Sequence, residues 1–164
     1  MQVSKPVELN DHQIKGWMRR LINRAESIGN QDEVPVAAVI LNEFGQSIGH
    51  GSNCRNRTSD PLGHAEIIAL RQASWLKGDW RFNECTLLVT LEPCHMCAAA
   101  LIQARMGKVI FAAKDPKRGG LGGSIDLSVL RSAHHRMIVQ GGILEKEART
   151  QLEDWFRKKR KYRR

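Results

Sequence analysis

The segment from Val34 to Asn42, VPVAAVILN, is the feature that most limits what this chain can fold into. It holds several β-branched residues and no polar residue before Asn42, which is typical of a strand buried on both of its faces. The segments 85–92, CTLLVTLE, and 108–114, KVIFAAK, also predict strands. Because a sheet with such strands must be covered on both sides, we expect helices above and below it.

Helical patterns alternate with the predicted strands. Residues 47–53 should pair with the first strand as a hairpin, and 136–144 should add a fifth strand. Apolar spacing predicts helices over four segments: 10–29, 64–77, 93–105 and 144–156. This order favours an α/β fold, a three-layer α/β/α sandwich with a mixed, mostly parallel five-stranded sheet. A length of 164 residues suits a single domain over 1–164.

The chain is strongly basic, with a formal net charge of +9. Much of the excess lies in the C-terminal tail 157–164, RKKRKYRR, which would attract a polyanion such as a nucleic acid. A solvated end without a partner is the alternative for this tail. Trp155, Phe156 and Tyr162 lie among the basic residues, and aromatic side chains commonly stack on unpaired bases.

The first residues, MQVSKPVELNDHQ, lack the apolar run of a signal peptide, and no later run reaches the length of a membrane helix. We therefore expect a cytoplasmic protein with no membrane partner. The four cysteines should stay reduced there. Metal binding or catalysis then explains them better than a disulfide framework does.

Cys94 and Cys97, in PCHMC, have the spacing of metal ligands. If Pro93 begins a helix, residues three apart project from one face of its first turn. The partial positive charge at a helix N-terminus favours the thiolate, which is the form that binds a soft cation such as zinc. The spacing alone also allows a thioredoxin-like redox pair or two buried structural cysteines.

His64, in GHAEIIAL, can supply a third ligand, and a catalytic zinc site has three protein ligands with a fourth position for water. Glu66 follows two residues later. Residues two apart on a helix point in different directions, so this carboxylate is free to act as acid and base. It would take a proton from zinc-bound water and pass protons to a ring nitrogen and a leaving amine. These residues together indicate hydrolytic deamination.

The pairing of H-A-E at 64–66 with P-C-x-x-C at 93–97 resembles the motif of zinc nucleoside and nucleobase deaminases. The flanking segments EVPVAAVI, TLEPCHMCAAAL, DPKRGGLGGSIDL and DWFRKKR extend the similarity to the bacterial tRNA-specific adenosine deaminases over residues 10–160. The resemblance implies a cytidine-deaminase-like fold, a homodimer and one Zn2+ per subunit. It also implies conversion of adenosine to inosine at the wobble position of a tRNA anticodon, with the anticodon stem-loop as partner and no DNA partner.

The same resemblance implies roles for residues outside the motif. Asn53 matches an asparagine that hydrogen-bonds the flipped nucleotide, and Asp115 matches a residue of a substrate loop. Phe156 and Arg160 match a terminal helix that contacts the anticodon loop, and Lys117 is expected to meet phosphate.

The chain departs from the family pattern at two places. His95 occupies a spacer position that is usually apolar or small, and the loop GGLGG at 119–123 is unusually rich in glycine. As a metal ligand His95 is disfavoured, because a residue adjacent to Cys94 on a helix points about 100° away from it.

Two other functions use many of the same residues. One is a deaminase of a free base or nucleotide, such as guanine, cytosine or a riboflavin precursor, and the other is a nucleic-acid-binding protein with a structural zinc. The basic tail favours a polynucleotide substrate over a small one. A structural zinc has four protein ligands, whereas this sequence offers three with an acid beside them.

Overall fold

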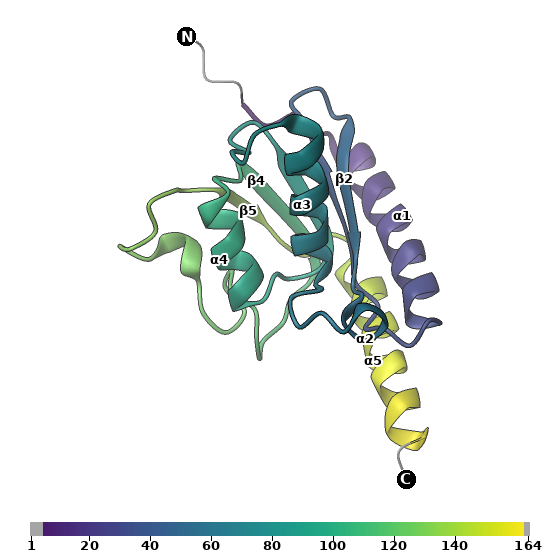
Figure 1. Cartoon of the computed structure of the whole chain (residues 1–164). Helices are drawn as coiled ribbons and strands as arrows, with labels where there is room; N and C mark the ends of the chain where they lie inside the picture. The colour runs from purple at the N-terminus through teal and green to yellow at the C-terminus, as the bar shows by residue number, and fades with distance from the viewer. Residues whose placement is uncertain (1–4, 163–164) are drawn as a thin grey trace.

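A computed structural model describes residues 5–162 of the chain. At its centre lies a sheet with the strand order β2-β1-β3-β4-β5 (Figure 1). β1 pairs antiparallel with both of its neighbours, while β3, β4 and β5 pair in parallel. Every strand except β1 therefore runs in the same direction, and the mixed, mostly parallel five-stranded sheet is confirmed. The strands are β1 Ala37–Leu41, β2 Ser47–Ser52, β3 Thr86–Leu91, β4 Lys108–Ala113 and β5 Ile138–Gln140.

Helices cover both faces of the sheet, as the buried strands require (Figure 1). Along β1 the side chains alternate: Ala37 and Val39 pack in the cluster with α1, while Ala38 and Ile40 pack in the cluster with α3 and α4. This alternation explains why no position of the strand is polar. The helices are α1 Asp11–Gly29, α2 Arg55–Thr58, α3 Ala65–Lys77, α4 His95–Gln103, η1 Leu127–Val129 and α5 Glu145–Tyr162.

The N-terminal end of α3 lies very close to β2. A Cβ atom built on Gly51 would fall 1.8 Å from the carbonyl oxygen of Ala65, and one on Gly49 would fall 2.5 Å from that of Ala69. Only glycine permits this approach of helix to strand. The close packing sets the position of the residues that begin α3.

Several predicted boundaries hold and others are wrong. Asn10 caps α1 in a capping box with Gln13, which confirms the predicted start of that helix. The prediction that Pro93 begins a helix is wrong, because α4 starts at His95 and Cys94 is its extended N-cap. The main chain at 93–94 pairs with a later loop instead, where the amide of Gly120 donates to the Pro93 carbonyl at 2.8 Å. The fifth strand is also shorter than 136–144.

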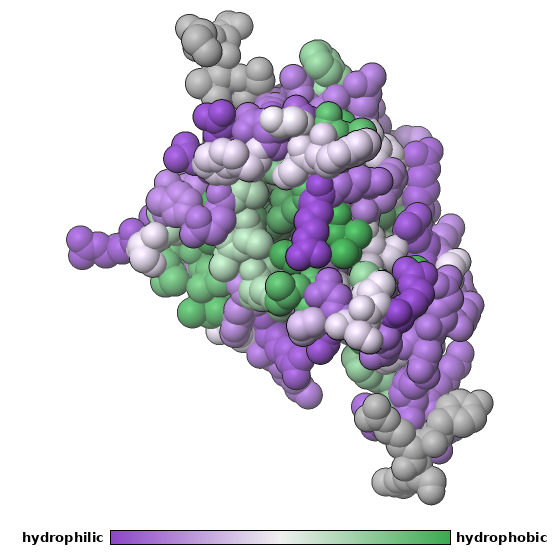
Figure 2. Space-filling model, in the orientation of Figure 1, coloured by the Kyte–Doolittle hydropathy of each residue, from purple (hydrophilic) through white to green (hydrophobic). Residues whose placement is uncertain are grey.

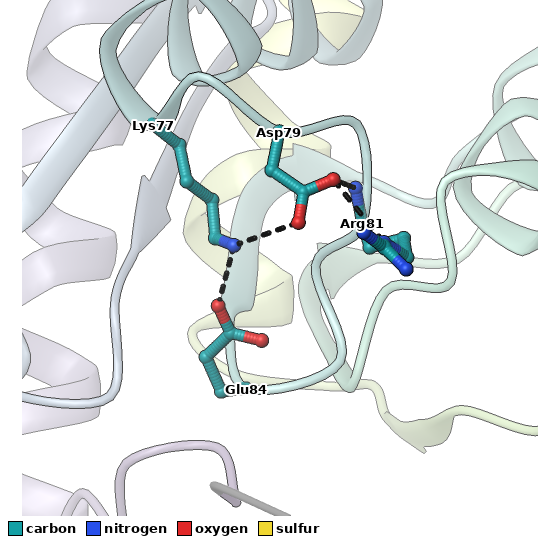
Figure 3. Close-up of polar contacts among 4 residues, drawn as sticks. All are labelled: Lys77, Asp79, Arg81 and Glu84. Carbon is teal, nitrogen blue, oxygen red and sulfur yellow. Dashed lines mark hydrogen bonds and ion pairs between the residues drawn. The ribbon is translucent and has the colours of Figure 1, made fainter.

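Ion pairs hold the loop between α3 and β3, at the end of α3 far from His64 (Figure 3). The Lys77 ammonium lies 2.8 Å from a Glu84 oxygen and 3.8 Å from an Asp79 oxygen, and Arg81 Nε lies 3.2 Å from Asp79. Such partly exposed pairs each contribute little to stability, typically about 0–1 kcal/mol. Within residues 5–162, the helices are too short or too polar to cross a membrane.

Candidate active site

Three side chains from the starts of two helices converge on one point. His64 is the N-cap of α3, Cys94 is the N-cap of α4, and Cys97 lies buried in the first turn of α4. His64 Nδ1 lies 3.6 Å from each sulfur, and all three ligand atoms fall within 4.8 Å of one another. The structure thus brings the predicted ligands together across a gap of about thirty residues in sequence, as the alternation of strand and helix predicts.

The distances between these atoms fit zinc. Ligand atoms of a tetrahedral zinc bound by cysteine and histidine lie roughly 3.5–3.8 Å apart, which follows from its bond lengths. Two sulfurs and one imidazole nitrogen are also the donors that zinc prefers, and three protein ligands leave a fourth position open. The residues present therefore fit a catalytic zinc site better than a closed structural one.

A hydrogen bond between the two cysteines shifts their pKa values in opposite directions. The Cys97 thiol donates a hydrogen bond that lowers the pKa of Cys94 to about 3, and the His64 ring acts in the same direction. The pKa of Cys97 is raised correspondingly, first by this hydrogen bond and then by burial. An anionic sulfur beside an imidazole is ready to accept a soft cation.

Glu66 lies in the first turn of α3 and is 4% exposed. Burial disfavours its charged form and raises the pKa of Glu66 to about 7. A carboxyl group with such a pKa can both accept and release a proton near neutral pH, which general acid–base catalysis requires. The group of metal-ligating atoms in the described residues does not include Glu66, and its role as acid and base stays a prediction.

A cleft of about 520 Å3 opens above this site. It is lined by residues from β-strand ends, from the loop after β4 and from α5. Every predicted site residue lies at this cleft except Cys97, which is buried behind it. The predicted residues in the lining are Asn53, His64, Glu66, Cys94, Asp115, Lys117, Phe156 and Arg160.

Asn53 is buried at the end of β2 and is held through its side-chain oxygen. Its Oδ1 accepts a hydrogen bond from the Ala65 amide at 2.9 Å, which satisfies a donor at the start of α3. The carbonyl side of the amide is thereby engaged by the protein. The NH2 group is the part of Asn53 that can donate to a substrate in the cleft.

Asp115 builds the turn that follows β4. Its Oδ1 accepts hydrogen bonds from the amides of Lys117 and Arg118, at 3.0 and 3.1 Å. This Asx-type arrangement fixes the backbone from which both basic side chains extend. The turn therefore brings Asp115, Lys117 and Arg118 to the cleft as one unit.

The last helix carries Phe156 and Arg160 to the cleft. Trp155 does not face the cleft: its indole donates to the Gly29 carbonyl at 2.9 Å, and its ring meets that of Phe156 edge to face. It therefore attaches α5 to the end of α1 and is not among the cleft residues. Phe156 remains 43% exposed and is available for stacking.

The predicted tail continues α5 as a helix through Tyr162. Arg157 pairs with Asp154, and Lys159 pairs with Asp32 beyond the end of α1. Residues 163–164 and the side chain of Tyr162 lie outside the described part. The helical geometry places Arg160 at the cleft, whereas Arg157 and Lys159 have acidic partners.

Sequence reasoning missed four charged residues of the cleft: Arg55, Glu92, Arg118 and Glu153. Arg118 is adjacent to Lys117, and Arg55 follows the predicted site residue Asn53 by two positions, so their sequence positions were a usable signal. Glu92 precedes Pro93, and nothing in the local pattern shows what it contacts. His95, left unexplained by the sequence, contacts Ser124 with Nε2 and Oγ 2.8 Å apart and is not in the group of candidate metal ligands found among the described residues.

A buried acid beside two thiols and an imidazole, at the helix starts of an α/β/α sandwich, defines the class of zinc-binding deaminases. Residues 11–113 match the family model of the cytidine and deoxycytidylate deaminase zinc-binding region. The chain belongs to this family, and zinc is the metal that its ligand set implies.

Known proteins refine this assignment. The chain is 36% identical over 150 residues to a tRNA-specific adenosine deaminase of Haemophilus influenzae, covering 92% of this chain and 85% of that protein. It is 42% identical over 135 residues to a tRNA(Ile)-lysidine synthase of Deinococcus radiodurans, covering 80% of this chain but only 22% of that protein. A solved tRNA:A34 deaminase, studied for A-to-I editing at the wobble position, superimposes with a TM-score of 0.79 at 34% identity. That match covers 83% of this chain and 98% of the other. The predicted resemblance to tRNA-specific adenosine deaminases is thus confirmed.

Proposed function

We propose that this chain is a zinc-dependent hydrolase that converts adenosine to inosine at the wobble position of a tRNA anticodon. The observation that carries the proposal is the shared cleft, which is lined by Glu66 and two of the metal ligands, His64 and Cys94. The same cleft is lined by Asn53, Phe156 and the basic residues. The similarity to tRNA-specific adenosine deaminases supports the choice of substrate. We propose further that residues 1–164 act as one deaminase domain with one Zn2+ per subunit.

The reaction replaces the amine at C6 of adenine by oxygen from water and releases ammonia. Zinc held by His64, Cys94 and Cys97 would supply Lewis acidity and make water a better nucleophile. Glu66 takes a proton from the attacking water and delivers protons to the ring nitrogen and to the leaving amine. Its buried position excludes bulk water from these transfers, and its raised pKa suits both directions of transfer.

The rim of the cleft suits a nucleotide that is part of a longer strand. The Asn53 NH2 group can donate to an acceptor on the base, and the exposed ring of Phe156 can stack on a neighbouring base. Lys117, Arg118 and Arg160 supply positive charge where phosphates of a single-stranded loop would pass. An anticodon stem-loop offers such a splayed nucleotide.

Incubation with unmodified tRNA followed by an assay for inosine tests this function. We expect inosine at the wobble position only. Free guanine, cytosine and a riboflavin precursor serve as competing substrates in the same assay. Activity on one of these without activity on tRNA would replace the proposal by the free-base alternative.

A homodimer is proposed as the assembly. Figure 2 shows an apolar area over α4 and the neighbouring η1, and Val129 and Leu130 are exposed large apolar side chains there. Alanines on α4 would let a second copy approach closely. Mass measurement in solution at micromolar concentration tests this, and a monomer throughout would contradict it. A cytoplasmic location and the absence of a DNA partner stay predictions.

A further inference from the structure

Glu92 is a buried acid that the proposed reaction does not use. It is 2% exposed, and both of its oxygens accept hydrogen bonds from main-chain amides. Oε2 accepts from Asp115 at 2.9 Å, while Oε1 accepts from Leu121 at 3.0 Å and from Gly123 at 2.8 Å. All three donors belong to the loop 115–124, so one carboxylate organises the whole loop. Hydrogen bonds to an ionised acceptor are stronger than those between neutral groups.

The glycines of this loop allow it to close around the carboxylate. A Cβ atom on Gly119 would lie 2.3 Å from Glu92 Cδ, and one on Gly123 would lie 2.5 Å from Glu92 Oε2. Both distances are too short for any side chain larger than hydrogen. The glycines of this loop therefore have a physical reason in the space that the Glu92 carboxylate and the Asp115 carbonyl occupy.

The far end of the loop is tied to the segment that holds a metal ligand. The Gly120 amide donates to the Pro93 carbonyl, and His95 contacts Ser124 at 2.8 Å. Glu92, Pro93 and His95 surround Cys94 in the sequence. The same short stretch of chain thus places one zinc ligand and anchors the loop.

We propose that Glu92 is a positioning residue for the substrate: its buried carboxylate holds the loop 115–124 so that Asp115, Lys117 and Arg118 face the tRNA. This inference rests on the proposed function. Glu92 acts through the loop, since the Asp115 amide that it binds begins the turn from which both basic side chains extend. Without such contacts, the loop 115–124 would not hold a single conformation, because fixing its backbone costs conformational entropy.

Glu92→Gln tests the proposal with almost no change in volume. The amide turns one acceptor oxygen into an NH2 group that faces main-chain donors, so at least one of the loop bonds is lost. We expect hydrogen exchange of the 115–124 amides to accelerate by about tenfold or more. We also expect KM for tRNA to rise by about tenfold with kcat changed by less than about threefold, and zinc content to be unchanged.

Glu84→Gln is the matched control, because Glu84 pairs with Lys77 at the opposite end of α3 and should leave the loop and KM unchanged. Gly119→Ala is the second variant, since its methyl group pushes the loop away from Glu92 without altering the acid. It should reproduce the faster exchange and the higher KM. Combining Glu92→Gln with Lys117→Ala should raise KM by less than the product of the two single effects.

Unchanged exchange in the loop of Glu92→Gln, or loss of zinc and of kcat with the loop still protected, would overturn the positioning role. Fully multiplicative effects in the double variant would also overturn it. If the native protein deaminates no tRNA, the proposed function fails, whereas the exchange measurement still decides whether Glu92 holds the loop.

Discussion

The indole N–H of Trp155 donates a hydrogen bond to the carbonyl oxygen of Gly29, with 2.9 Å between nitrogen and oxygen. This bond joins the C-terminal end of α1 to the middle of α5, and its two residues are 126 positions apart in the sequence. Phe156, adjacent to Trp155, extends to the cleft. The position of a substrate-side residue therefore depends on a contact outside the cleft.

Trp155→Phe should weaken tRNA binding without affecting the chemical step. Phenylalanine keeps an aromatic ring but cannot donate to Gly29, so the free energy of unfolding should fall by about 0.5–1.5 kcal/mol. We expect KM for tRNA to rise several-fold while kcat stays near the native value, measured by steady-state kinetics. Trp75→Phe is the control, because Trp75 is 81% exposed on α3. Equal effects of the two substitutions would contradict the role given to Trp155.

Glu66→Gln should abolish turnover while zinc and tRNA remain bound. The amide fits the same buried space but cannot transfer a proton, and loss of a general acid–base commonly lowers rates by about 10²–10⁴-fold. Metal analysis and a binding assay with tRNA check the variant alongside kinetics. Loss of zinc would mean that Glu66 is a ligand and that its assigned role is wrong.

The raised pKa of Glu66 predicts how stability depends on pH in protein freed of zinc by chelation. Burial raises the pKa of Glu66 from 4.5 to about 7, so the folded state holds this proton over a range in which the unfolded state has lost it. The contribution of Glu66 to stability falls as pH rises above about 4.5, and the loss is complete above about 7. Glu66→Gln never ionises and should have a higher Tm than the native chain at pH 8. The two Tm values should converge near pH 4, as calorimetry can measure. A difference in Tm that is independent of pH would contradict this account.

Cys97→Ser should remove zinc from the protein. Cys97 supplies one of only three ligand atoms in the described group, and serine is a much poorer ligand for this metal. We expect one zinc per chain in the native protein and less than about one tenth of that in the variant, with a lower Tm because bound metal stabilises the folded state. Cys85→Ala is the control, since Cys85 lies in the core cluster between the sheet and α3 and should leave zinc content unchanged. Retention of a full zinc content in Cys97→Ser would exclude the assigned site.

Arg160→Ala should reduce the salt dependence of tRNA binding. One phosphate contact to a single-stranded region contributes about 0.7 to the slope of log K against log salt, so the slope should fall by roughly this amount. Deletion of 157–164 should reduce it at least as much. Lys15→Ala, on the exposed side of α1, is the charge-matched control. If neither Arg160→Ala nor the deletion of 157–164 changes the slope, α5 does not contact the RNA backbone.

Much of the site could be predicted because its chemistry is encoded locally. The H-A-E and P-C-x-x-C motifs indicate the candidate ligands and the candidate acid, and strand–helix alternation places the starts of both helices at one end of the sheet. The alternating burial of Ala37 and Ala38 likewise follows from an unbroken apolar strand. The motif residues lie within a few positions of one another, and the apolar residues of strands and helices repeat with a known period.

Other features depend on partners that are distant in sequence. The sequence around Glu92, LEPC, does not show that its carboxylate binds the loop 115–124. Trp155 stands close to basic residues in the sequence, which does not show that its indole binds Gly29. Pro93 has the right sequence context for a helix start. Its carbonyl accepts a hydrogen bond from the Gly120 amide instead, and the helix begins at His95.

The candidate ligands, the candidate acid and the layers of the fold can be predicted from the sequence alone, because ligand spacing and hydrophobic periodicity are local properties. How the substrate side of the cleft is held in place can be read only from the folded chain. A buried polar group must find hydrogen-bond partners wherever the folded chain offers them, and no local pattern states which main-chain amides those will be.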